Sequence, residues 1–402
     1  MNRKEGRNNM STSKVKVGLV GLGNIGTTHA ENLSKMDHVD LVGVCDIVKE
    51  KADIFATRYK STAYYDYHDL LQNSGLDAII VAVPHYDHAP ISIEAFAHNV
   101  HVLCEKPLAV HVNDAKKMIS AFDVARSKNP KLLFGIMFQE RTNPFYRKLK
   151  DLLDHGDLGR LTRVTWINTT WFRTQAYYDS GTWRATWAGE GGGILTNQCP
   201  HNLDMYQWLF GLPIRISGHA HIGKYHQIEV EDEVTAYFEH EDGMIGHFIV
   251  STAESPGTNR LEIVGEHGKL VYEDSKIVFY RNRESMLQFL VESKESFSHV
   301  ENWETSIPVK TDGHVGHYMV AKRFIEATLN GSNELTANGP EGLNGLMLAN
   351  GIMLSSFTNK SIDVPFDGDD YERMLKDLAQ NSKIVKTMRS DVMTHINESF
   401  NV

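Results

Sequence analysis

Residues 15–33 read VKVGLVGLGNIGTTHAENL, and this stretch decides the fold of the first part of the chain. Its opening, VKVGLV, is short and rich in β-branched side chains, which predicts a strand. A glycine turn follows, and the spaced apolar positions of TTHAENL predict a helix. The segment VDLVGVCD, residues 39–46, predicts a second strand. Strand, helix and strand in this order make a βαβ unit, which joins two parallel strands.

The turn carries three glycines at the spacing GxGxxG. The first glycine of this motif permits a tight turn, the second lets a pyrophosphate approach the backbone, and the third lets the helix pack on the strand. The N-terminus of the helix also attracts the phosphate charge. We therefore predict a dinucleotide-binding loop made of Gly21, Gly23, Asn24, Ile25 and Gly26. A chance glycine turn is the weaker alternative, because the strand and helix context is correct.

Asp46 ends the second predicted strand, 20 residues after Gly26. A carboxylate at this place binds the ribose 2′-hydroxyl of NAD and repels the 2′-phosphate of NADP. No arginine directly follows Asp46, which favours NAD. Lys49 and Lys51 lie close enough in the sequence to keep NADP open.

The alternation of strand and helix continues and predicts an α/β fold, with a Rossmann domain of doubly wound parallel sheet over residues 14–143. From Pro144 onward, long strand-like segments joined by short polar turns predict antiparallel hairpins. We therefore expect residues 144–402 to form a C-terminal α+β domain, with a large, mainly antiparallel sheet, that binds substrate and mediates oligomerisation. Residues 1–13 are polar and are expected to form a disordered tail, not a signal peptide.

The composition excludes several classes of function. The chain of 402 residues is 41% hydrophobic and 23% charged, and its net charge of -10 comes with no basic stripe that could bind nucleic acid. No apolar run is long enough to span a membrane. The three cysteines, Cys45, Cys104 and Cys199, show neither a disulfide pattern nor a zinc-ligand spacing, so we expect no bound metal. We expect their thiols to be buried in a protein of the reducing cytoplasm.

The segment LCEKPLAV places Glu105, Lys106 and Pro107 at the C-terminal end of a predicted parallel strand. This edge of a doubly wound sheet lines the ligand crevice. A lysine beside a cationic nicotinamide ring has a lowered pKa, which suits proton transfer or stabilisation of an alkoxide. A solvated lysine after a strand is the commoner arrangement, so both interpretations stay open at this point.

A second candidate segment, GEGGGILTNQCPHNLDMYQWLFG, spans residues 189–211. Glycines 191 to 193 let the backbone approach a ligand or the other domain, and Pro200 fits only in the first turn of a helix. Asn197 can donate and accept hydrogen bonds but cannot carry a negative charge. Helical spacing then places four side chains on one face: His201, Asp204, Met205 and Trp208. We expect His201 to point into the crevice and Trp208 to pack beneath it.

Four segments together resemble the Gfo/Idh/MocA oxidoreductase family: GLVGLGNIGTTHAENL, VPHYDH, HVLCEKPLAV and GGGILTNQCPHNLD, in that order and spacing. The resemblance extends from about Lys14 to about Asp367. It implies a Rossmann domain, a C-terminal domain whose sheet face often mediates dimers or tetramers, and NAD(P)-dependent oxidoreduction of a sugar or cyclitol carbon. We accordingly expect a homodimer or homotetramer that binds a small molecule.

The resemblance also assigns roles to individual residues. Lys106 matches the lysine of the family's EKP motif, which contacts the reacting hydroxyl, and Pro107 matches a proline often preceded by a cis peptide bond. His201 matches the histidine that serves as acid/base or orients the substrate, and Asp204 matches the closing aspartate. Asn197 departs from the pattern, because the family usually has Asp there, and Pro200 directly before His201 is a second departure. Lys106 and His201 are therefore the predicted catalytic residues, with Asn197 in substrate binding.

Further candidates lie between these motifs. Val83, Pro84 and His88 follow a buried strand and are predicted to line the cofactor site with Glu105 and Lys106, although His88, like His85, could be an ordinary helix-start residue. Aromatic faces with a fixed guanidinium suit a sugar ring, so Tyr178 and Arg184 are the preferred substrate contacts in QAYYDSGTWRATWAGE, with a core cluster as the alternative. Arg141 is predicted to bind substrate or, equally, to form an interdomain ion pair.

These observations predict a dehydrogenase that takes hydride from a secondary hydroxyl carbon of a sugar, glycoside, anhydrosugar or cyclitol, with NAD or NADP as cofactor. The GEGGG and NQxPH variants look most like family members that act on anhydrosugars such as levoglucosan, or at C3 of glycosides. An NAD-dependent redox-neutral glycosidase and a non-catalytic dinucleotide sensor stay open as alternatives. The presence of both Lys106 and His201 argues against the sensor.

Overall fold

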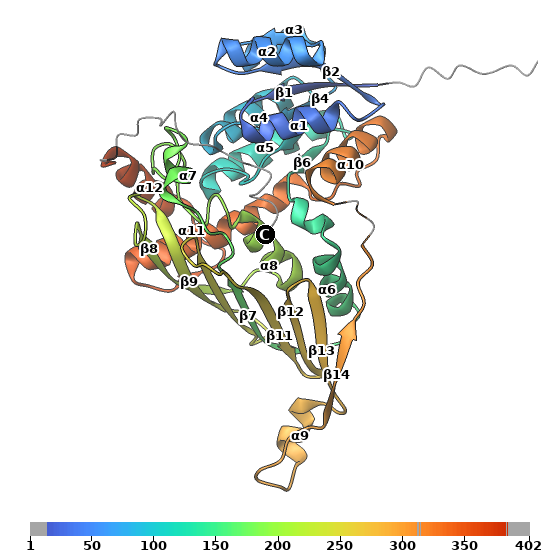
Figure 1. Ribbon diagram of the computed structural model, residues 1–402, viewed down its shortest axis with the longest axis vertical. Helices are drawn as coiled ribbons and strands as arrows, with labels where there is room; N and C mark the ends of the chain where they lie inside the picture. Colours follow the sequence, from blue (N-terminus) through green and yellow to red (C-terminus); the bar gives the residue numbers. More distant parts are fainter. Residues whose placement is uncertain (1–13, 312, 314, 383, 385–402) are drawn as a thin grey trace, which may run out of the picture.

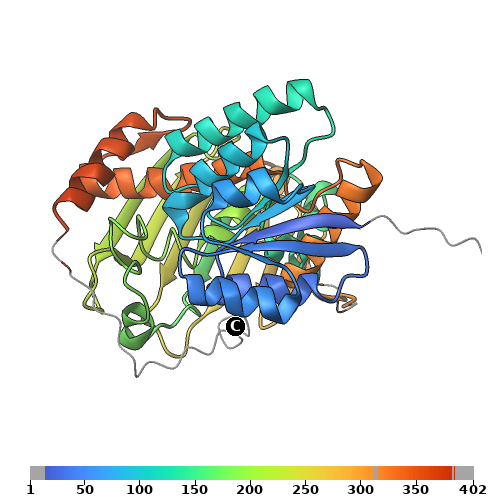
Figure 2. The same cartoon turned by 90° about the horizontal axis from the view of Figure 1, so that it is seen from above.

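The computed structural model describes residues 14–311, 313, 315–382 and 384, so the predicted tail at residues 1–13 lies outside the described residues. Two units lie one above the other in Figure 1, each built around its own sheet. Figure 2 looks down on the first unit, which lies over the strands of the second. This arrangement confirms the predicted α/β fold with a Rossmann sheet and a second, mainly antiparallel sheet.

The first sheet is parallel throughout, with the strand order β3-β2-β1-β4-β5-β6. The order reverses between β1 and β4, and ligands bind in such sheets at the carboxyl ends of the strands beside this reversal. Strands β1, β4 and β5 are almost fully buried, because helices cover both faces. The six strands are β1 (Val15–Val20), β2 (Val39–Cys45), β3 (Thr62–Tyr64), β4 (Ala78–Val81), β5 (His101–Cys104) and β6 (Phe134–Ile136).

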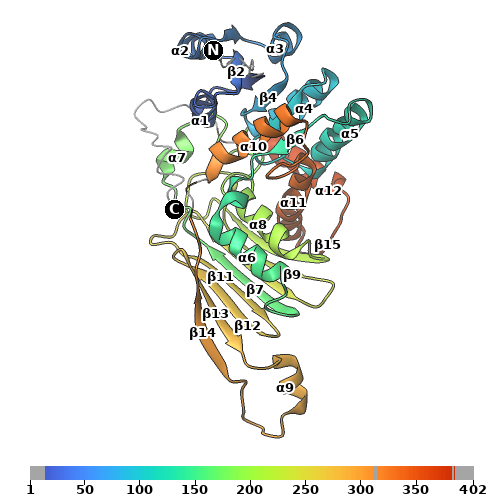
Figure 3. The same cartoon turned by 90° about the vertical axis from the view of Figure 1, so that its right-hand side faces the viewer.

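Helices of the first unit follow the predicted alternation: α1 (Asn24–Leu33), α2 (Lys49–Tyr59), α3 (Tyr67–Asn73), α4 (His88–Ala97) and α5 (Val112–Lys128). One further helix, α10 (Gly316–Asn330), comes from far along the chain and joins this unit, as Figure 3 shows in orange. Its Val320 and Phe324 are buried in one core with Leu19 and Ala30. A division of the chain at residue 143 therefore separates α10 from the core that it completes.

The second sheet has nine strands in the order β14-β13-β12-β11-β7-β10-β9-β8-β15. Neighbouring strands are antiparallel except for β7 and β10, which are parallel. The turns EHEDG and GEHG close antiparallel hairpins, as predicted. The strands are β7 (Leu161–Asn168), β8 (Arg215–Ile222), β9 (Glu231–Glu239), β10 (Ile245–Ser251), β11 (Asn259–Gly265), β12 (Gly268–Glu273), β13 (Lys276–Asn282), β14 (Asn302–Ile307) and β15 (Ile362–Asp363).

Helices α6 (Pro144–Asp154), α8 (Pro200–Phe210) and α11 (Gly342–Thr358) lie on one face of this sheet (Figure 3). Helix α8 starts at Pro200, the first-turn position that tolerates proline. The remaining helices are the short α7 (Gln175–Asp179), α9 (Met286–Glu292) beyond the end of the sheet in Figure 1, and α12 (Asp369–Gln380). Within the described residues, no helix is long and apolar enough to cross a membrane.

Candidate active site

The glycine loop connects β1 to α1 and has room for a phosphate group. A Cβ atom on Gly26 would lie 2.0 Å from the carbonyl oxygen of Gly21, so only glycine lets the helix start this close to the strand. Gly23 is different, because a Cβ there would meet nothing within 4 Å. No side chain caps the N-terminus of α1 at Gly23. The loop therefore presents uncapped backbone N–H groups to open space, a donor set that fits a pyrophosphate.

Asp46 lies beside this loop at the end of β2. Its Oδ2 accepts a hydrogen bond from the backbone N–H of Leu22 at 2.9 Å, and its Oδ1 accepts one from Val48 at 2.8 Å. A carboxylate has about four lone-pair sites, so these two bonds leave acceptor capacity for a ribose hydroxyl. Val83 packs against Gly21 on the neighbouring strand end, next to Pro84. The predicted dinucleotide residues thus meet at the strand-order reversal, and their chemistry fits NAD.

Two buried histidines brace the residues around Lys106. His29 Nε2 lies 2.8 Å from Glu105 Oε1, and burial alone would raise the pKa of Glu105, but the hydrogen bond and charge of His29 lower it to about 2. His88 lies with Nδ1 at 2.7 Å from the carbonyl oxygen of Pro107 and Nε2 at 3.0 Å from that of Val83. His88 therefore braces two segments of the crevice through backbone oxygens, and its predicted contact with the cofactor stays a prediction.

Lys106 lies at the contact between the two units. The peptide bond between Lys106 and Pro107 is cis, and the Lys106 ammonium donates a hydrogen bond to the backbone oxygen of Asn197 at 2.7 Å. Burial lowers the pKa of Lys106, while the carboxylates of Glu105 and Glu190 act against this shift. An ammonium has three N–H donors, so the bond to Asn197 leaves Lys106 able to contact a reacting oxygen.

His201 approaches Lys106 from the first turn of α8. Burial and the charge of Lys106 hold the pKa of His201 well below its usual range, so the imidazole is neutral at neutral pH. The Gln139 side-chain nitrogen lies 3.0 Å from His201 Nε2. When the Gln139 nitrogen donates to Nε2, the single ring proton of the neutral imidazole is on Nδ1. If the amide is turned by half a turn, its oxygen faces Nε2 instead, and this arrangement favours the tautomer with the proton on Nε2. Gln139 therefore sets which nitrogen of His201 can accept a proton.

Three buried polar atoms have no hydrogen-bond partner among the described residues: His201 Nδ1, Oε1 of the neighbouring Gln139, and Oε1 of Gln198, which lies three residues before His201 in the chain. An unpaired buried polar atom is costly, and native structures normally pair such atoms with protein, water or ligand. Amide oxygens accept hydrogen bonds and a ring nitrogen donates or accepts one, which is the set that sugar hydroxyls need. These atoms are therefore suited to a polyhydroxylated ligand between the two units.

The glycine-rich segment before α8 packs tightly on its surroundings. A Cβ atom on Gly191 would lie 2.1 Å from Val110 of the first unit, and one on Gly193 would lie 2.0 Å from the carbonyl oxygen of Glu231. The buried Glu231 carboxylate accepts hydrogen bonds from the backbone N–H groups of Gly193 and Leu195 at 2.9 and 3.0 Å. The glycines thus allow the close approach to the other domain that the sequence predicted.

Glu190 and Asn197 form a pair inside this segment. The Asn197 side-chain nitrogen donates to Glu190 Oε1, and Glu190 Oε2 accepts from the backbone N–H of Ala185 at 2.5 Å. The Glu190 backbone oxygen also lies 3.1 Å from His85 Nδ1. Glu190 is 2% exposed, so its carboxylate is a buried charge next to the backbone that holds Lys106.

The aromatic segment before the glycines divides between the site and the core. Arg184 stacks on the rings of Trp183 and Tyr177, with centroid distances of 4.6 and 4.8 Å, and its charge influences Lys106. Tyr178, in contrast, is 2% exposed, and its hydroxyl donates to Thr252 Oγ1 at 3.0 Å. Arg184 therefore lies within electrostatic reach of Lys106, and Tyr178 is packed in the core; both predicted substrate contacts stay predictions.

Arg141 lies in an ion-pair cluster between the units. Its Nε and Nη2 atoms donate to the two oxygens of Asp204 at 2.9 and 2.7 Å, and its Nη1 pairs with Glu341. The Arg141 side chain is buried and stacks on Trp208. Of the two roles predicted for Arg141, the structure favours the interdomain ion pair over substrate binding, and Asp204 serves as its partner.

Sequence reasoning missed several residues of this site. Gln139 and Gln198 belong to no motif, and Gln139 lies 62 residues before the histidine that it contacts. Glu190 stands inside the GEGGG segment, so its place directly before three glycines was the one available signal. His29 follows the GxGxxG motif by three residues, on the helix face that turns toward Glu105.

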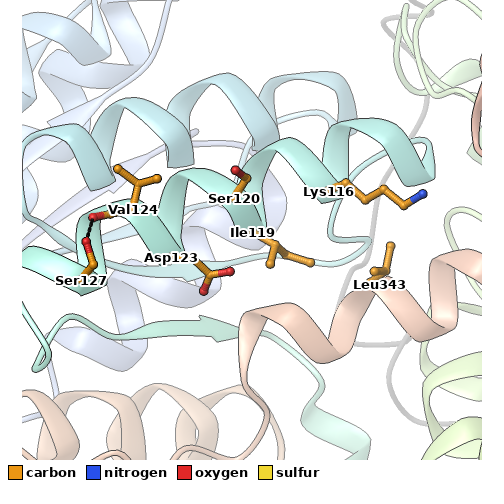
Figure 4. Close-up of a pocket in the computed structure, with 7 residues that line it drawn as sticks. All are labelled: Lys116, Ile119, Ser120, Asp123, Val124, Ser127 and Leu343. Atoms are coloured by element: carbon orange, nitrogen blue, oxygen red, sulfur yellow. Dashed lines mark hydrogen bonds between the residues drawn. The ribbon is translucent and has the colours of Figure 1, made fainter.

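A surface groove lies elsewhere, between α5 and the start of α11 (Figure 4). Its lining combines aliphatic and short polar side chains and lacks the residues of the crevice described above. The residues are Lys116, Ile119, Ser120, Asp123, Val124, Ser127 and Leu343. This groove is therefore separate from the crevice between the two units.

Two models of one protein family match the chain. The oxidoreductase family model with the NAD-binding Rossmann fold matches residues 15–129, and the GFO/IDH/MocA C-terminal domain model matches residues 146–271. The two matches cover both units, on either side of the predicted boundary. Together they include the glycine loop, Lys106 and His201.

Individual relatives agree with these models. Inositol 2-dehydrogenase of Salmonella typhimurium is 36% identical over 149 residues, which cover 36% of this chain and 43% of that protein; the match thus spans less than half of this relative. WlbA dehydrogenase of Bordetella pertussis, solved in complex with NADH and UDP-GlcNAcA, is 26% identical with a TM-score of 0.73, and the match covers 88% of this chain and 100% of that one. Levoglucosan dehydrogenase, solved with NADH and levoglucosan, is 18% identical with a TM-score of 0.71, and the match covers 88% of this chain and 100% of that one. At this identity, the likeness shows a shared fold alone.

Proposed function

Since the chain belongs to the Gfo/Idh/MocA oxidoreductase family, we propose that it is an NAD-dependent dehydrogenase that oxidises a secondary hydroxyl of a sugar or cyclitol. The observation that carries this proposal is the meeting of Lys106 and His201, one from each unit, beside the glycine loop. Unpaired buried polar atoms of His201, of Gln139 beside it and of Gln198 support a ligand rich in hydroxyl groups.

His201 takes the proton of the reacting hydroxyl in this proposal. Its imidazole is neutral at neutral pH, as a general base must be. Lys106 donates a hydrogen bond to the same oxygen and stabilises the negative charge that develops there. The backbone oxygen of Asn197 fixes the Lys106 ammonium at 2.7 Å, and Gln139 orients the imidazole at 3.0 Å.

NAD bound on the glycine loop would accept the hydride. The residues that would hold it are the N-terminal turn of α1 for the pyrophosphate and Asp46 for the ribose. The negative charge of Asp46 supports NAD over NADP, because a 2′-phosphate would be repelled there. One relative supports the same cofactor, since WlbA dehydrogenase of Bordetella pertussis was solved in complex with NADH.

Absorbance at 340 nm tests the proposal. Purified protein with NAD, and separately NADP, would be offered inositols, free hexoses, levoglucosan and simple glycosides, with His201→Asn as the inactive control. Sustained formation of NADH with one group is the expected result. If no substrate yields NADH but chromatography shows cleavage of a glycoside, the protein is a redox-neutral glycosidase and not a dehydrogenase. If neither NADH formation nor glycoside cleavage is detected, the proposal is contradicted.

We also propose that the chain assembles into a dimer or tetramer through its second unit. Helices cover one face of the nine-stranded sheet, and the other face carries no helix among the described elements (Figure 3). Beyond the sheet, the segment around α9 exposes Leu290, Val291 and Phe297 by 72%, 84% and 101%. Light scattering coupled to size-exclusion chromatography tests this, and a monomer at micromolar concentration would refute it.

A further inference from the structure

Gln139 and His201 contact each other in the crevice, one from each unit. The side-chain nitrogen of Gln139 lies 3.0 Å from His201 Nε2, and the two residues are only 5% and 4% exposed. Gln139 begins the short 3₁₀ helix η2 (Gln139–Thr142) after β6, and His201 lies in the first turn of α8. Gln139 therefore occupies one ring nitrogen of His201 and leaves Nδ1 as the nitrogen that a ligand can use.

One atom of each partner in this contact lacks a hydrogen bond. These atoms are His201 Nδ1 and Gln139 Oε1, both buried and unpaired among the described residues. A neutral imidazole and an amide can meet in two arrangements. In the first, the amide nitrogen donates to Nε2 and the ring proton is on Nδ1; in the second, the turned amide accepts from Nε2–H and Nδ1 keeps a free lone pair. Each arrangement leaves two polar atoms unpaired, so a ligand that pairs with them decides between the two.

Only the second arrangement makes His201 a base. In the first, the amide engages the lone pair of Nε2 and Nδ1 already carries the proton, so neither nitrogen can take a proton from a hydroxyl. In the second, Nδ1 can accept that proton. The amide nitrogen then faces away from the ring and can donate to a hydroxyl oxygen of the same ligand. A polyhydroxylated ligand thus pairs both atoms that the second arrangement leaves unpaired.

A ligand that displaced Gln139 from Nε2 would leave more atoms unpaired. The amide of Gln139 would lose its contact with the ring and stay buried, and the proton on His201 Nδ1 would still lack an acceptor. Buried polar groups without partners are costly, so this alternative is less favourable than a turn of the amide in place.

We infer that Gln139 is a positioning residue of this site: its amide oxygen accepts a hydrogen bond from His201 Nε2–H, and His201 Nδ1 is the atom that takes the substrate proton. The inference rests on the proposed function and assigns its base to one atom. As the O–H bond of the secondary hydroxyl breaks, the proton goes to Nδ1. The hydride of the same carbon goes to oxidised NAD, and a C=O bond forms. The imidazolium keeps its Nε2 proton against the Gln139 oxygen.

Several charged and titratable groups surround the His201 ring. They are Lys106 and Glu105 at the end of β5, His317 on α10, and the buried ion pair of Asp204 with Arg141. Burial and the charge of Lys106 lower the pKa of His201. All of these groups stay in place when residue 139 is substituted, so a change in the acid limb of the pH–rate profile reports on residue 139 itself.

Gln139→Glu and Gln139→Met separate the acceptor from the shape of the side chain. Both match glutamine in length, but an ionised glutamate only accepts hydrogen bonds, and the methionine sulfur accepts weakly and cannot donate. Initial rates at 340 nm would be measured with NAD and the inositols, hexoses, levoglucosan and glycosides of the substrate panel. We expect kcat of Gln139→Met to fall about tenfold or more, with KM for NAD within about threefold of the native value.

Gln139→Glu should restore kcat to within about threefold of the native protein at pH values above its acid limb. The limb itself should move up by about one pH unit or more, because a carboxylate beside Nε2 stabilises the imidazolium. Gln380→Met and Gln380→Glu, at an exposed position of α12, are the matched controls and should change neither quantity. Equal losses of kcat in Gln139→Glu and Gln139→Met would show that no acceptor is needed at position 139 and would overturn the inference.

NMR of the native protein decides the question if the variants do not fold. The protein would carry ¹⁵N-labelled histidine and be saturated with NADH and with the fastest substrate of the panel. The ring ¹⁵N shifts show which nitrogen holds the proton, and the His201 signals are assigned by their loss in His201→Asn. A proton on Nε2 is expected, and a proton on Nδ1 alone would overturn the inference.

The failures of the two proposals are distinguishable. If the native protein oxidises a member of the panel and Gln139→Met keeps its kcat within about threefold, this inference fails and the dehydrogenase stands. If the native protein oxidises no member of the panel, the proposed function is contradicted, and the inference that rests on it is withdrawn as well.

Discussion

The Lys106 ammonium lies 2.7 Å from the backbone oxygen of Asn197, and this bond joins the Rossmann unit to the glycine-rich segment before α8. Lys106 comes from the end of β5, where a parallel sheet presents its ligands, and Asn197 comes from the backbone that Glu231 and the glycines hold in place. The proposed reacting position therefore depends on the packing of both units, since neither one holds both Lys106 and His201, the two proposed catalytic groups.

Lys106→Met should abolish most of the activity while NADH binding persists. The methionine has a similar length but cannot donate a hydrogen bond to the reacting oxygen, so kcat should fall roughly 10²–10⁴-fold. Initial rates at 340 nm measure the loss, and NADH fluorescence titration measures cofactor binding separately. Activity within threefold of the native protein would remove Lys106 from the mechanism.

Asp46→Ala should weaken the preference for NAD over NADP by about tenfold or more, since about 1.4 kcal/mol corresponds to a factor of ten. The change removes the charge that repels a 2′-phosphate, together with the bonds to Leu22 and Val48. The ratio of kcat/KM for the two cofactors is the measurement. Asp40→Ala, on an exposed position of the same strand, is the matched control and should leave the ratio unchanged. An unchanged ratio in Asp46→Ala would mean that this carboxylate does not face the ribose.

The motifs explain how much of this site could be predicted from the sequence. The glycine loop, Asp46, Lys106 and His201 occupy fixed positions within strand and helix signals, and the structure brings them to one crevice. Gln139 could not be found in this way, because amides carry no motif and its contact spans 62 residues. Arg141 and Tyr178 are predicted from residue type alone; the structure shows Arg141 in a buried ion pair and Tyr178 buried, and their substrate contacts stay predictions.

The same limit applies to the fold. Alternation identified the strands with one buried face, but β14 is exposed along nearly its whole length and therefore shows no pattern of burial. Strand β15 has two residues, too few for any periodicity. Helix α10 takes its place in the first unit through long-range packing with Leu19 and Ala30, which local sequence patterns do not record.

Glu231→Gln should flatten the pH dependence of stability. Burial raises the pKa of Glu231 from 4.5 to about 7 in the folded protein. Between these values the folded state holds a proton that the unfolded state has released, so raising the pH favours unfolding. Between pH 4.5 and pH 7, the free energy of unfolding of the native protein should fall by up to about 3 kcal/mol relative to that of Glu231→Gln. Above pH 7 little further change is expected. Urea unfolding at pH 4.5, 5.5, 6.5 and 7.5 measures the difference, and parallel stability curves would contradict this assignment.

Glu190→Gln should shift the alkaline limb of the pH–rate profile to lower pH. The Glu190 carboxylate raises the pKa of Lys106 against the effect of burial, so its removal makes the ammonium lose its proton more easily. Catalysis that needs protonated Lys106 then fails at a lower pH. Glu304→Gln, on the exposed strand β14, is the control and should leave the profile unchanged. An unmoved limb in Glu190→Gln would show that Glu190 only packs.

Asn197→Asp combined with Glu190→Gln tests whether the place of the charge matters. In the native protein the Asn197 amide donates to Glu190, whereas Asn197→Asp alone would place two repelling carboxylates side by side. We therefore expect this single variant to fold less stably and to have an altered pH–rate profile. The double variant restores one carboxylate and one amide, with donor and acceptor exchanged. Its alkaline limb should return toward that of the native protein, because a negative charge again acts on Lys106. A double variant as impaired as the sum of the single variants would show that the two side chains act independently and that position 197 tolerates no charge.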